Sequence, residues 1–190
     1  KKPNRPKIKK KLKKIVFSEN IILTNFGRTA FFFILKFLKI REPSKKEVLV
    51  SSYNFFEIIN MIIYNKLTPV FYDLDKHSLN LNTKDLQKKI NKNTLCILIT
   101  HFNGFDTNTF KIKKLANKKK IKLIEDCAIS LNTNLNSPVS KSGDFSFYSL
   151  NFTKNLSSIT GGIIKTNRSN FKKLNKIIFN SNFSIFHSFK

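Results

Sequence analysis

The sequence predicts an α/β domain in which a mainly parallel sheet is covered by helices on both faces. Short apolar runs recur along the chain, and longer segments with helical patterning lie between them. Several of these runs are rich in Ile, Val, Leu or Phe and end at a polar residue, as buried strands of parallel sheets do. A regular alternation of strands and helices implies right-handed crossover connections, which place helices on the two faces of the sheet.

The expected strands share a short length and an apolar, often β-branched composition. They are the segments 47–52, 68–74, 94–100, 120–126, 144–150 and 161–167. The expected helices are 29–40, 55–66, 83–91 and 109–120, and the last two carry apolar residues on one side and lysines on the other. Thr83 is expected to cap the helix that begins there, with Asp85 in its first turn. No internal repeat or Pro/Gly linker divides the chain, so one domain is expected.

The chain is strongly basic, with 36 Lys and Arg against 11 Asp and Glu and a net charge of +25 over 190 residues. Such a charge raises the question of nucleic acid or an anionic membrane as a partner. However, Lys, Asn, Ile and Phe are abundant together, and A/T-rich codons encode all four, so drift in base composition explains much of the charge. The N-terminus is especially lysine-rich. We expect residues 1–19 to form a solvated basic arm ahead of a domain at 20–190.

Cysteine usage and hydropathy favour a soluble cytoplasmic protein with no membrane partner. Cys96 and Cys127 each lie in an apolar run, which fits a reduced compartment better than a disulfide framework. The longest apolar runs fall well short of the roughly 20 residues that a membrane-spanning helix requires. The basic start is not followed by the pattern of a secretory signal.

Ligands of parallel α/β sheets collect beyond the carboxyl ends of the strands, so the residues at these ends are candidate site residues. Asp126 ends an apolar strand, and a carboxylate in a dry pocket stays charged only when a cation pairs with it. A simple turn or cap role is the alternative. The segment GRTA at 27–30 opens a helix, and free N–H groups at a helix start suit a phosphate. An ordinary glycine turn is the alternative there.

Lys154 is the single charged residue of the otherwise uncharged, hydroxyl-rich run YSLNFTKNLSSITGG, whereas most other lysines come in groups. A partly desolvated ammonium loses its proton more easily, and the neutral amine attacks carbonyl groups. A surface lysine is the alternative. His101 follows a predicted strand and is expected to form part of the wall of the site, while His77 and His187 are expected at the surface.

Taken in order, these segments resemble the DegT/DnrJ/StrS-type pyridoxal-phosphate-dependent sugar aminotransferases, which have fold type I. The similarity runs from about residue 20 to about residue 167. The matching segments are GRTA at 27–30, SSYNFFEIINMIIYNKLTPVFYDLD at 51–75, THFNG at 100–104, LIEDCAIS at 123–130 and GDFSFYSLNFTKN at 143–155, followed by GG.

The resemblance implies a role for each matching residue. Lys154 matches the lysine that forms the internal aldimine with pyridoxal 5'-phosphate, and Asp126 matches the acid that pairs with the pyridine nitrogen. Phe55 is at the position of the aromatic residue that stacks on the cofactor ring. The phosphate-binding positions match Ser149, Arg28 and Thr29. No metal site is expected.

By the same resemblance, the protein is expected to be a homodimeric aminotransferase of surface-polysaccharide or related biosynthesis. Its substrate would be a nucleotide-linked keto-sugar, and its amino donor an amino acid, most simply glutamate. A dehydratase branch of the family carries His at the lysine position, so Lys154 favours transamination.

The chain departs from the family pattern at several positions. Ile129 replaces the Gln or His that touches the ring hydroxyl, Asn54 replaces a Thr, and Asn151-Phe152 replaces a Pro. Family members are also longer and continue into a small C-terminal domain, so we interpret the chain as the large domain with the small domain absent. Two alternatives stay open: a degenerate or truncated non-catalytic relative and, more remotely, a basic nucleic-acid-binding protein.

Overall fold

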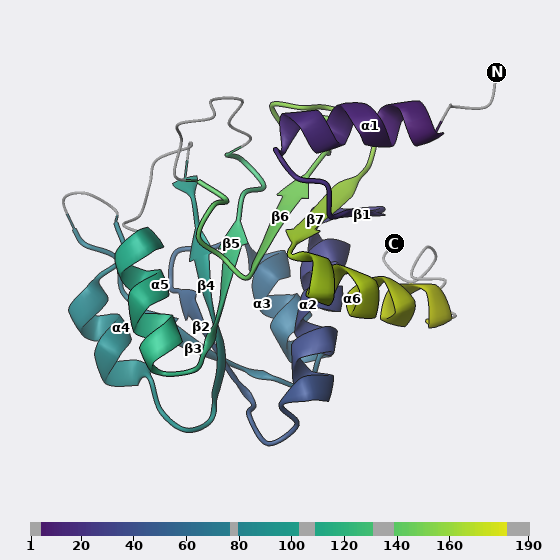
Figure 1. Cartoon of the computed structure of the whole chain (residues 1–190). Coiled ribbons are helices and arrows are strands. Elements are labelled where there is room, and N and C mark those ends of the chain that lie inside the picture. The colour runs from purple at the N-terminus through teal and green to yellow at the C-terminus, as the bar shows by residue number, and fades with distance from the viewer. Residues whose placement is uncertain (1–4, 77–79, 103–108, 131–138, 182–190) are drawn as a thin grey trace.

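A computed structural model describes residues 5–76, 80–102, 109–130 and 139–181 of the chain. In this part of the protein, a seven-stranded sheet has the order β1-β7-β6-β5-β4-β2-β3 (Figure 1). The strands are β1 (Ile21–Thr24), β2 (Glu47–Ser51), β3 (Thr68–Tyr72), β4 (Thr94–Thr100), β5 (Lys122–Asp126), β6 (Phe145–Ser149) and β7 (Gly162–Thr166).

The sheet is mainly parallel, as the sequence predicts. Strands β3, β2, β4, β5 and β6 pair in parallel, while β7 runs antiparallel to both β6 and β1. All six predicted strands are present. The sequence reasoning did not identify β1, which is only four residues long and lies at an edge of the sheet.

Helices cover both faces of the sheet, which confirms the predicted fold class. They are α1 (Arg5–Ile15), α2 (Gly27–Arg41), α3 (Phe56–Tyr64), α4 (Thr83–Lys89), α5 (Thr109–Lys118) and α6 (Arg168–Asn180). Side chains of α2, α3 and α6 share one apolar cluster with the sheet, and those of α4 and α5 share another with its opposite face. The cap of α4 is Asn82, whose side chain accepts a hydrogen bond from the backbone N–H of Asp85, and not Thr83.

Strand residues alternate between the two apolar layers, as the pleat requires. On β2, Val48 and Val50 face the layer of α2 and α3, whereas Leu49 faces the layer of α4 and α5. The phenylalanines of α2 fill the first layer. The Phe31 ring lies 5.2 Å from that of Phe147, centroid to centroid. Aromatic contacts of this kind stabilise a fold by roughly 0.5–1.5 kcal/mol beyond the effect of burial alone. This contact therefore helps to hold α2 against the sheet.

The basic N-terminus differs from the expected solvated arm. Residues 5–15 form α1, and its Leu12 together with Val16 is buried in a third apolar cluster with Tyr148 and Ile163. Apolar residues at helical spacing among the lysines give α1 one face that can pack on the sheet while its lysines face water. This segment therefore packs against the sheet through Leu12 and Val16.

The fold places the start of two helices at the carboxyl edge of the parallel strands. α2 begins directly after β1 and α3 begins after β2, close to the ends of β4, β5 and β6.

Cys96 and Cys127 are buried free thiols. None of the helices in the described residues combines the length and the apolar character needed to cross a membrane.

Candidate functional site

A cavity of about 550 Å³ opens where the ends of β4, β5 and β6 meet the starts of α2 and α3. Its volume lies in the range of about 300–1,000 Å³ that is typical of small-molecule sites. Five of the six residues singled out from the sequence line it, although they come from five separate segments: Arg28, Phe55, Asp126, Ser149 and Lys154.

Thr29 is the exception. Its side chain is buried and is not among the residues that line the cavity. Successive residues of a helix point about 100° apart, and here Arg28 faces the cavity while the Thr29 side chain is buried in the domain. Thr29 stays a predicted residue of the phosphate-binding helix start, where it offers its backbone N–H in the first turn of α2.

The start of α2 has the properties of an anion site. The first N–H groups of an α-helix have no acceptor inside the helix, and Phe26 at the N-cap provides no side-chain acceptor. Gly27 brings this helix start against β6, because a Cβ atom at Gly27 would lie only 3.0 Å from the Cβ of Ser149. The positive end of the helix and the Ser149 residue therefore share one corner of the cavity.

Arg28 lies in that corner, but its charge is already paired. Its Nη1 atom donates to both carboxylate oxygens of Glu57, at 2.7 and 2.9 Å, and its guanidinium lies 4.3 Å from the centroid of the Phe26 ring. Glu57 is in the first turn of α3, so this pair joins the starts of the two helices. The sequence reasoning missed Glu57, whose only signal was an acidic residue near an expected helix start.

Asp126 forms the floor of the cavity at the end of β5 and is only 4% exposed. Burial raises the pKa of its carboxyl group to about 6, although the Ala128 N–H, His101 and Lys154 act in the opposite direction. The Ala128 N–H donates to Oδ1 at 2.9 Å. A carboxylate in this setting favours a cationic partner in the cavity, because its charge is poorly solvated.

Lys154 lies on the loop that connects β6 to β7. Its backbone N–H donates to the Asn151 carbonyl at 2.9 Å, and hydrogen bonds from Leu150 N to Gly161 O and from Ser158 N to Leu150 O close the base of the loop. The side chain is partly buried and lines the cavity. Its charge lowers the pKa of Asp126, so the amine and the carboxylate face a common space.

The remaining wall is aromatic and apolar. Phe55 is the N-cap residue of α3 and is 60% exposed toward the cavity mouth. The preceding Asn54 fixes this segment to β4 through a 2.9 Å hydrogen bond from its Nδ2 to Thr100 Oγ1. Ile129 also lines the cavity. Its side chain presents a hydrocarbon surface where a Gln or His would present a hydrogen-bonding group.

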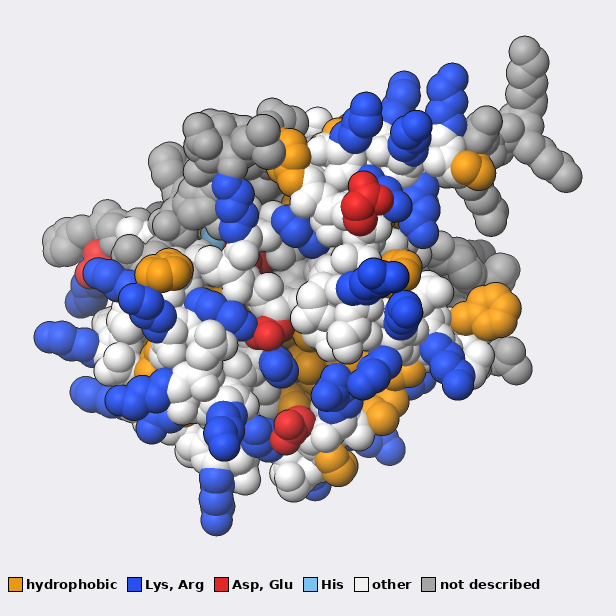
Figure 2. Space-filling model, in the orientation of Figure 1, with side chains coloured by type: hydrophobic (Ala, Val, Ile, Leu, Met, Phe, Trp, Pro, Cys, Tyr) orange, Lys and Arg blue, Asp and Glu red, His pale blue; other side chains and the backbone are white. Residues whose placement is uncertain are grey.

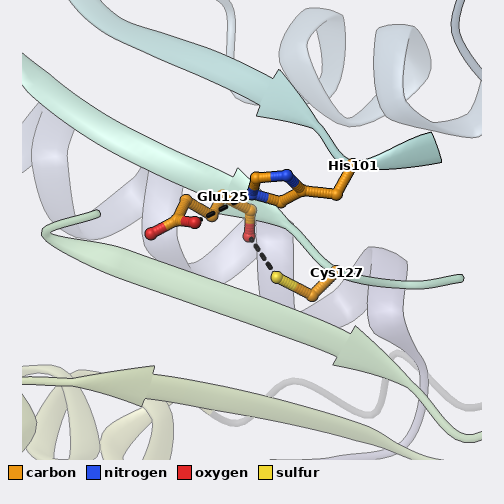
Figure 3. Close-up of side chains that lie close together, drawn as sticks. All are labelled: His101, Glu125 and Cys127. Carbon is orange, nitrogen blue, oxygen red and sulfur yellow. Dashed lines mark hydrogen bonds and ion pairs between the residues drawn. The ribbon is translucent and has the colours of Figure 1, made fainter. Parts of the chain in front are cut away.

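His101 does not form the site wall that the sequence suggested. It is fully buried, and its Nε2 contacts Glu125 Oε2 at 2.8 Å beneath the cavity floor (Figure 3). Strand alternation explains the difference, because Thr100 and His101 point to opposite faces of the sheet and Thr100 lines the cavity. The other two histidines, His77 and His187, lie outside the described residues.

Side-chain atoms of His101, Glu125 and Cys127 lie within 4.8 Å of one another, a spacing that could hold a metal ion. Their bonding differs from that of an open metal site. Both Glu125 oxygens accept hydrogen bonds, and the Cys127 Sγ approaches the Glu125 carbonyl oxygen at 3.9 Å (Figure 3). Burial also raises the pKa of the Cys127 thiol, which disfavours the thiolate that metals bind. The cluster is organised as a hydrogen-bonded support.

The comparison with known proteins identifies the family. A model of the DegT/DnrJ/EryC1/StrS aminotransferase family matches residues 3–185. The chain is 30% identical over 172 residues to the dTDP-4-amino-4,6-dideoxy-D-glucose transaminase of Shigella dysenteriae, covering 90% of this chain and 46% of that protein. It is also 30% identical over 122 residues to the GDP-perosamine synthase of Vibrio cholerae, covering 64% of this chain and 33% of that protein.

Solved structures show the same fold. Helicobacter pylori PseC, an aminotransferase involved in the biosynthesis of pseudoaminic acid, matches with a TM-score of 0.83 and 20% identity over 94% of this chain and 48% of that chain. Bacillus subtilis NtdA with bound cofactor PMP matches with a TM-score of 0.79 and 24% identity, over 92% and 39%. The chain thus spans about half or less of the length of these relatives. It belongs to the DegT/DnrJ/EryC1/StrS aminotransferase family.

Proposed function

We propose that this chain carries the cofactor-binding part of a pyridoxal-phosphate-dependent aminotransferase that acts on a nucleotide-linked keto-sugar. The observation that carries the proposal is the meeting of Lys154 and Asp126 in one cavity, beside the uncapped start of α2 and Ser149. Family membership supports it, as do the transaminase name of one relative and the cofactor named with NtdA.

The residues present fit the chemical groups of pyridoxal 5'-phosphate. The start of α2 and the Ser149 hydroxyl suit its phosphate, and Arg28 adds a positive charge that Glu57 partly offsets. The Asp126 carboxylate is buried at the floor of the cavity and is poorly solvated. A protonated ring nitrogen would stabilise its negative charge in place of water. Phe55 offers an aromatic face for stacking on the ring. Lys154 supplies the amine that captures the aldehyde.

When bound, the cofactor accepts the electrons that are released as a Cα–H bond of the substrate breaks. Asp126 keeps a proton on the ring nitrogen through its negative charge. Lys154 Nζ, when it is not bonded to the cofactor, would act as a general base that takes the proton from the substrate α-carbon and later returns one. The start of α2 and Ser149 hold the phosphate and so keep the ring in register with this nitrogen.

The proposal extends to the partners implied by the family. We assign glutamate as the amino donor, a homodimer as the assembly, the cytoplasm as the location, and polysaccharide biosynthesis as the pathway class. The dimer has some support in the surface around the cavity mouth, where Tyr53, Phe55 and Phe56 are each at least 60% exposed. A second protomer would remove this aromatic surface from water.

Ile129 favours one alternative, a relative that binds the cofactor without turnover. Its side chain cannot hydrogen-bond the ring hydroxyl, so the cofactor would be bound without that contact to adjust the electron distribution of its ring.

Nucleic-acid binding has weaker support. Lys and Arg side chains are spread over the visible face, including α1, and do not form a single stripe (Figure 2). A dispersed charge of this kind gives the salt-dependent, sequence-independent attraction of any basic protein.

The test is covalent capture of the cofactor. The purified chain is mixed with pyridoxal phosphate, reduced with borohydride and digested, and the labelled peptide is identified by mass spectrometry. We expect the label on Lys154, an absorption band of the bound cofactor before reduction, and loss of both in Lys154→Ala. Lys118→Ala, at the end of α5, is the matched control and should behave as the parent chain. Labelling spread over surface lysines, with no change in Lys154→Ala, would refute the proposal.

A further inference from the structure

A buried carboxylate lies directly behind the cavity floor. Glu125 precedes Asp126 on β5, so their side chains point to opposite faces of the sheet. The Glu125 side chain is fully buried and accepts four hydrogen bonds. Oε2 accepts from His101 Nε2 at 2.8 Å and from Ser140 N at 2.7 Å, and Oε1 accepts from Ser142 N at 3.0 Å and from Gly143 N. So many donors fix a buried carboxylate in one orientation.

The chain before β6 is shaped around this carboxylate. Ser140 has a φ of 64°, in the left-handed region that L-residues seldom adopt. A Cβ atom at Gly143 would lie 2.7 Å from the Phe145 carbonyl oxygen and 2.9 Å from Glu125 Oε1. The glycine is therefore needed for the close approach of its N–H to Glu125. Neither the cavity nor the proposed reaction explains why this segment converges on Glu125.

His101 connects this carboxylate to Asp126. Its backbone N–H donates to the Asp126 carbonyl at 3.0 Å, and its own carbonyl accepts a hydrogen bond from Ser130 Oγ. The other donors to Glu125 are all N–H groups, so the carboxylate acts as the acceptor and Nε2 of His101 carries a proton (Figure 3). The imidazole is thus held in a fixed position on the far side of the residue that forms the floor.

Few charged groups face Asp126. Among the described residues, the groups that interact electrostatically with it are Lys154, His101, Tyr72 and Cys127. Burial raises the pKa of the Tyr72 hydroxyl and of the Cys127 thiol, so both are neutral at physiological pH. Two side chains lower the pKa of Asp126: Lys154, on a loop of the cavity wall, and His101, anchored within the sheet. Lys154 takes part in the proposed chemistry, whereas His101 stays in place.

We propose that His101 is a positioning residue for Asp126: anchored by Glu125, it fixes the Asp126 backbone at the cavity floor and places positive charge behind its carboxylate. Asp126 therefore keeps its contacts with His101 even when the Lys154 amine changes its bonding partner in the cavity. The role given to Asp126 rests on the proposed function, but the link from Glu125 through His101 to Asp126 is a property of the chain without cofactor, so it can be tested separately.

The test compares His101→Gln with His101→Leu in the full chain without added cofactor. A Gln side chain can keep an N–H directed at Glu125 but carries no charge, whereas Leu removes both. Ser130→Ala is the matched control, because it removes a hydrogen bond to the His101 carbonyl and leaves the imidazole in place. The ionisation of Asp126 is followed directly by carbon NMR of its carboxyl group, assigned by the loss of that signal in Asp126→Asn.

We expect the ionisation midpoint of Asp126 to rise by about one pH unit in His101→Gln, because a nearby cation lowers a carboxyl pKa by one or more units. His101→Leu should show the same rise together with a lower melting temperature, and Ser130→Ala should lower only the melting temperature. The pH dependence of pyridoxal phosphate affinity should move upward with the midpoint.

An unchanged midpoint in His101→Gln, in a variant that folds as the parent does, would overturn the proposal and leave His101 a purely structural residue. A raised midpoint in a chain that binds no pyridoxal phosphate would support the role of His101 and would instead count against the proposed function. If His101→Leu fails to fold, the Gln variant still decides the question.

Discussion

Replacing Asp126 by Asn should make the cofactor-free chain more stable at neutral pH, although it removes a residue central to the proposed function. Burial raises the pKa of Asp126 to about 6 from the ordinary value of 3.8. The difference of roughly two units corresponds to about 3 kcal/mol at about 1.4 kcal/mol per unit. The amide side chain of the variant would keep an oxygen for the Ala128 N–H and would carry no charge that burial can penalise.

The sign of the pH dependence follows from proton linkage. The folded chain binds the Asp126 proton more tightly than the unfolded chain, so between pH 4 and pH 6 the free energy of unfolding falls as the pH rises. Above about pH 7 the folded and the unfolded chain have both lost this proton, so the free energy of unfolding falls no further from this cause. The stability gap between Asp126→Asn and the parent should therefore grow from near zero at pH 4 to about 3 kcal/mol at pH 8, with roughly half of it present at pH 5.

The assay is urea unfolding of both chains between pH 4.5 and pH 8, without cofactor and in phosphate-free buffer. Asp73→Asn is the matched control, because Asp73 is exposed beyond the end of β3 and its replacement removes no buried charge. Added pyridoxal phosphate should stabilise the parent more than Asp126→Asn. A gap that stays constant with pH, or an Asn variant that is less stable at pH 8, would refute the reasoning about the buried charge.

Three further substitutions test other parts of the structure. Gly27→Ala should destabilise the chain by about 1–3 kcal/mol and weaken phosphate binding severalfold in calorimetric titrations, because its Cβ would press on Ser149; wild-type affinity would contradict the helix-start site. Leu12→Ala should cost about 2–3 kcal/mol in urea unfolding, whereas Ile8→Ala, which removes a side chain that is 44% exposed, should cost under about 0.5; equal effects would mean that α1 does not pack as described. Ile129→Gln should tighten pyridoxal phosphate binding severalfold by adding a donor to the cavity wall; weaker binding would argue that Ile129 is part of a matched apolar wall.

The interior of the sheet was predictable because its chemistry is local. A strand covered on both faces must be apolar throughout, so runs such as TLCILIT at 94–100 are recognisable in the sequence, and β4 is buried along its whole length. α1 and α6 were not anticipated, since lysines and asparagines mask their narrow apolar faces. The four residues of β1 are too few for a periodic signal, and this strand exists because β7 offers it an edge.

Family motifs supplied Lys154, Asp126, Phe55, Ser149 and Arg28 as candidate residues, because the order of residue types along a chain is visible without coordinates. Their convergence depends on the sheet order, which brings the ends of β4, β5 and β6 beside the starts of α2 and α3. Residue order in the sequence does not specify which strands become neighbours in space.

Tertiary structure alone decided the directions of side chains and the state of charges. Strand alternation turned His101 away from the cavity, and helix geometry turned Thr29 away from it. Packing paired Arg28 with Glu57 and surrounded Glu125 with donors. The pKa of Asp126 depends on how much water and which cations reach it, and these are set by residues distant in the chain. The sequence by itself thus determined the fold class and the candidate site residues, whereas burial and long-range contacts determined what surrounds them.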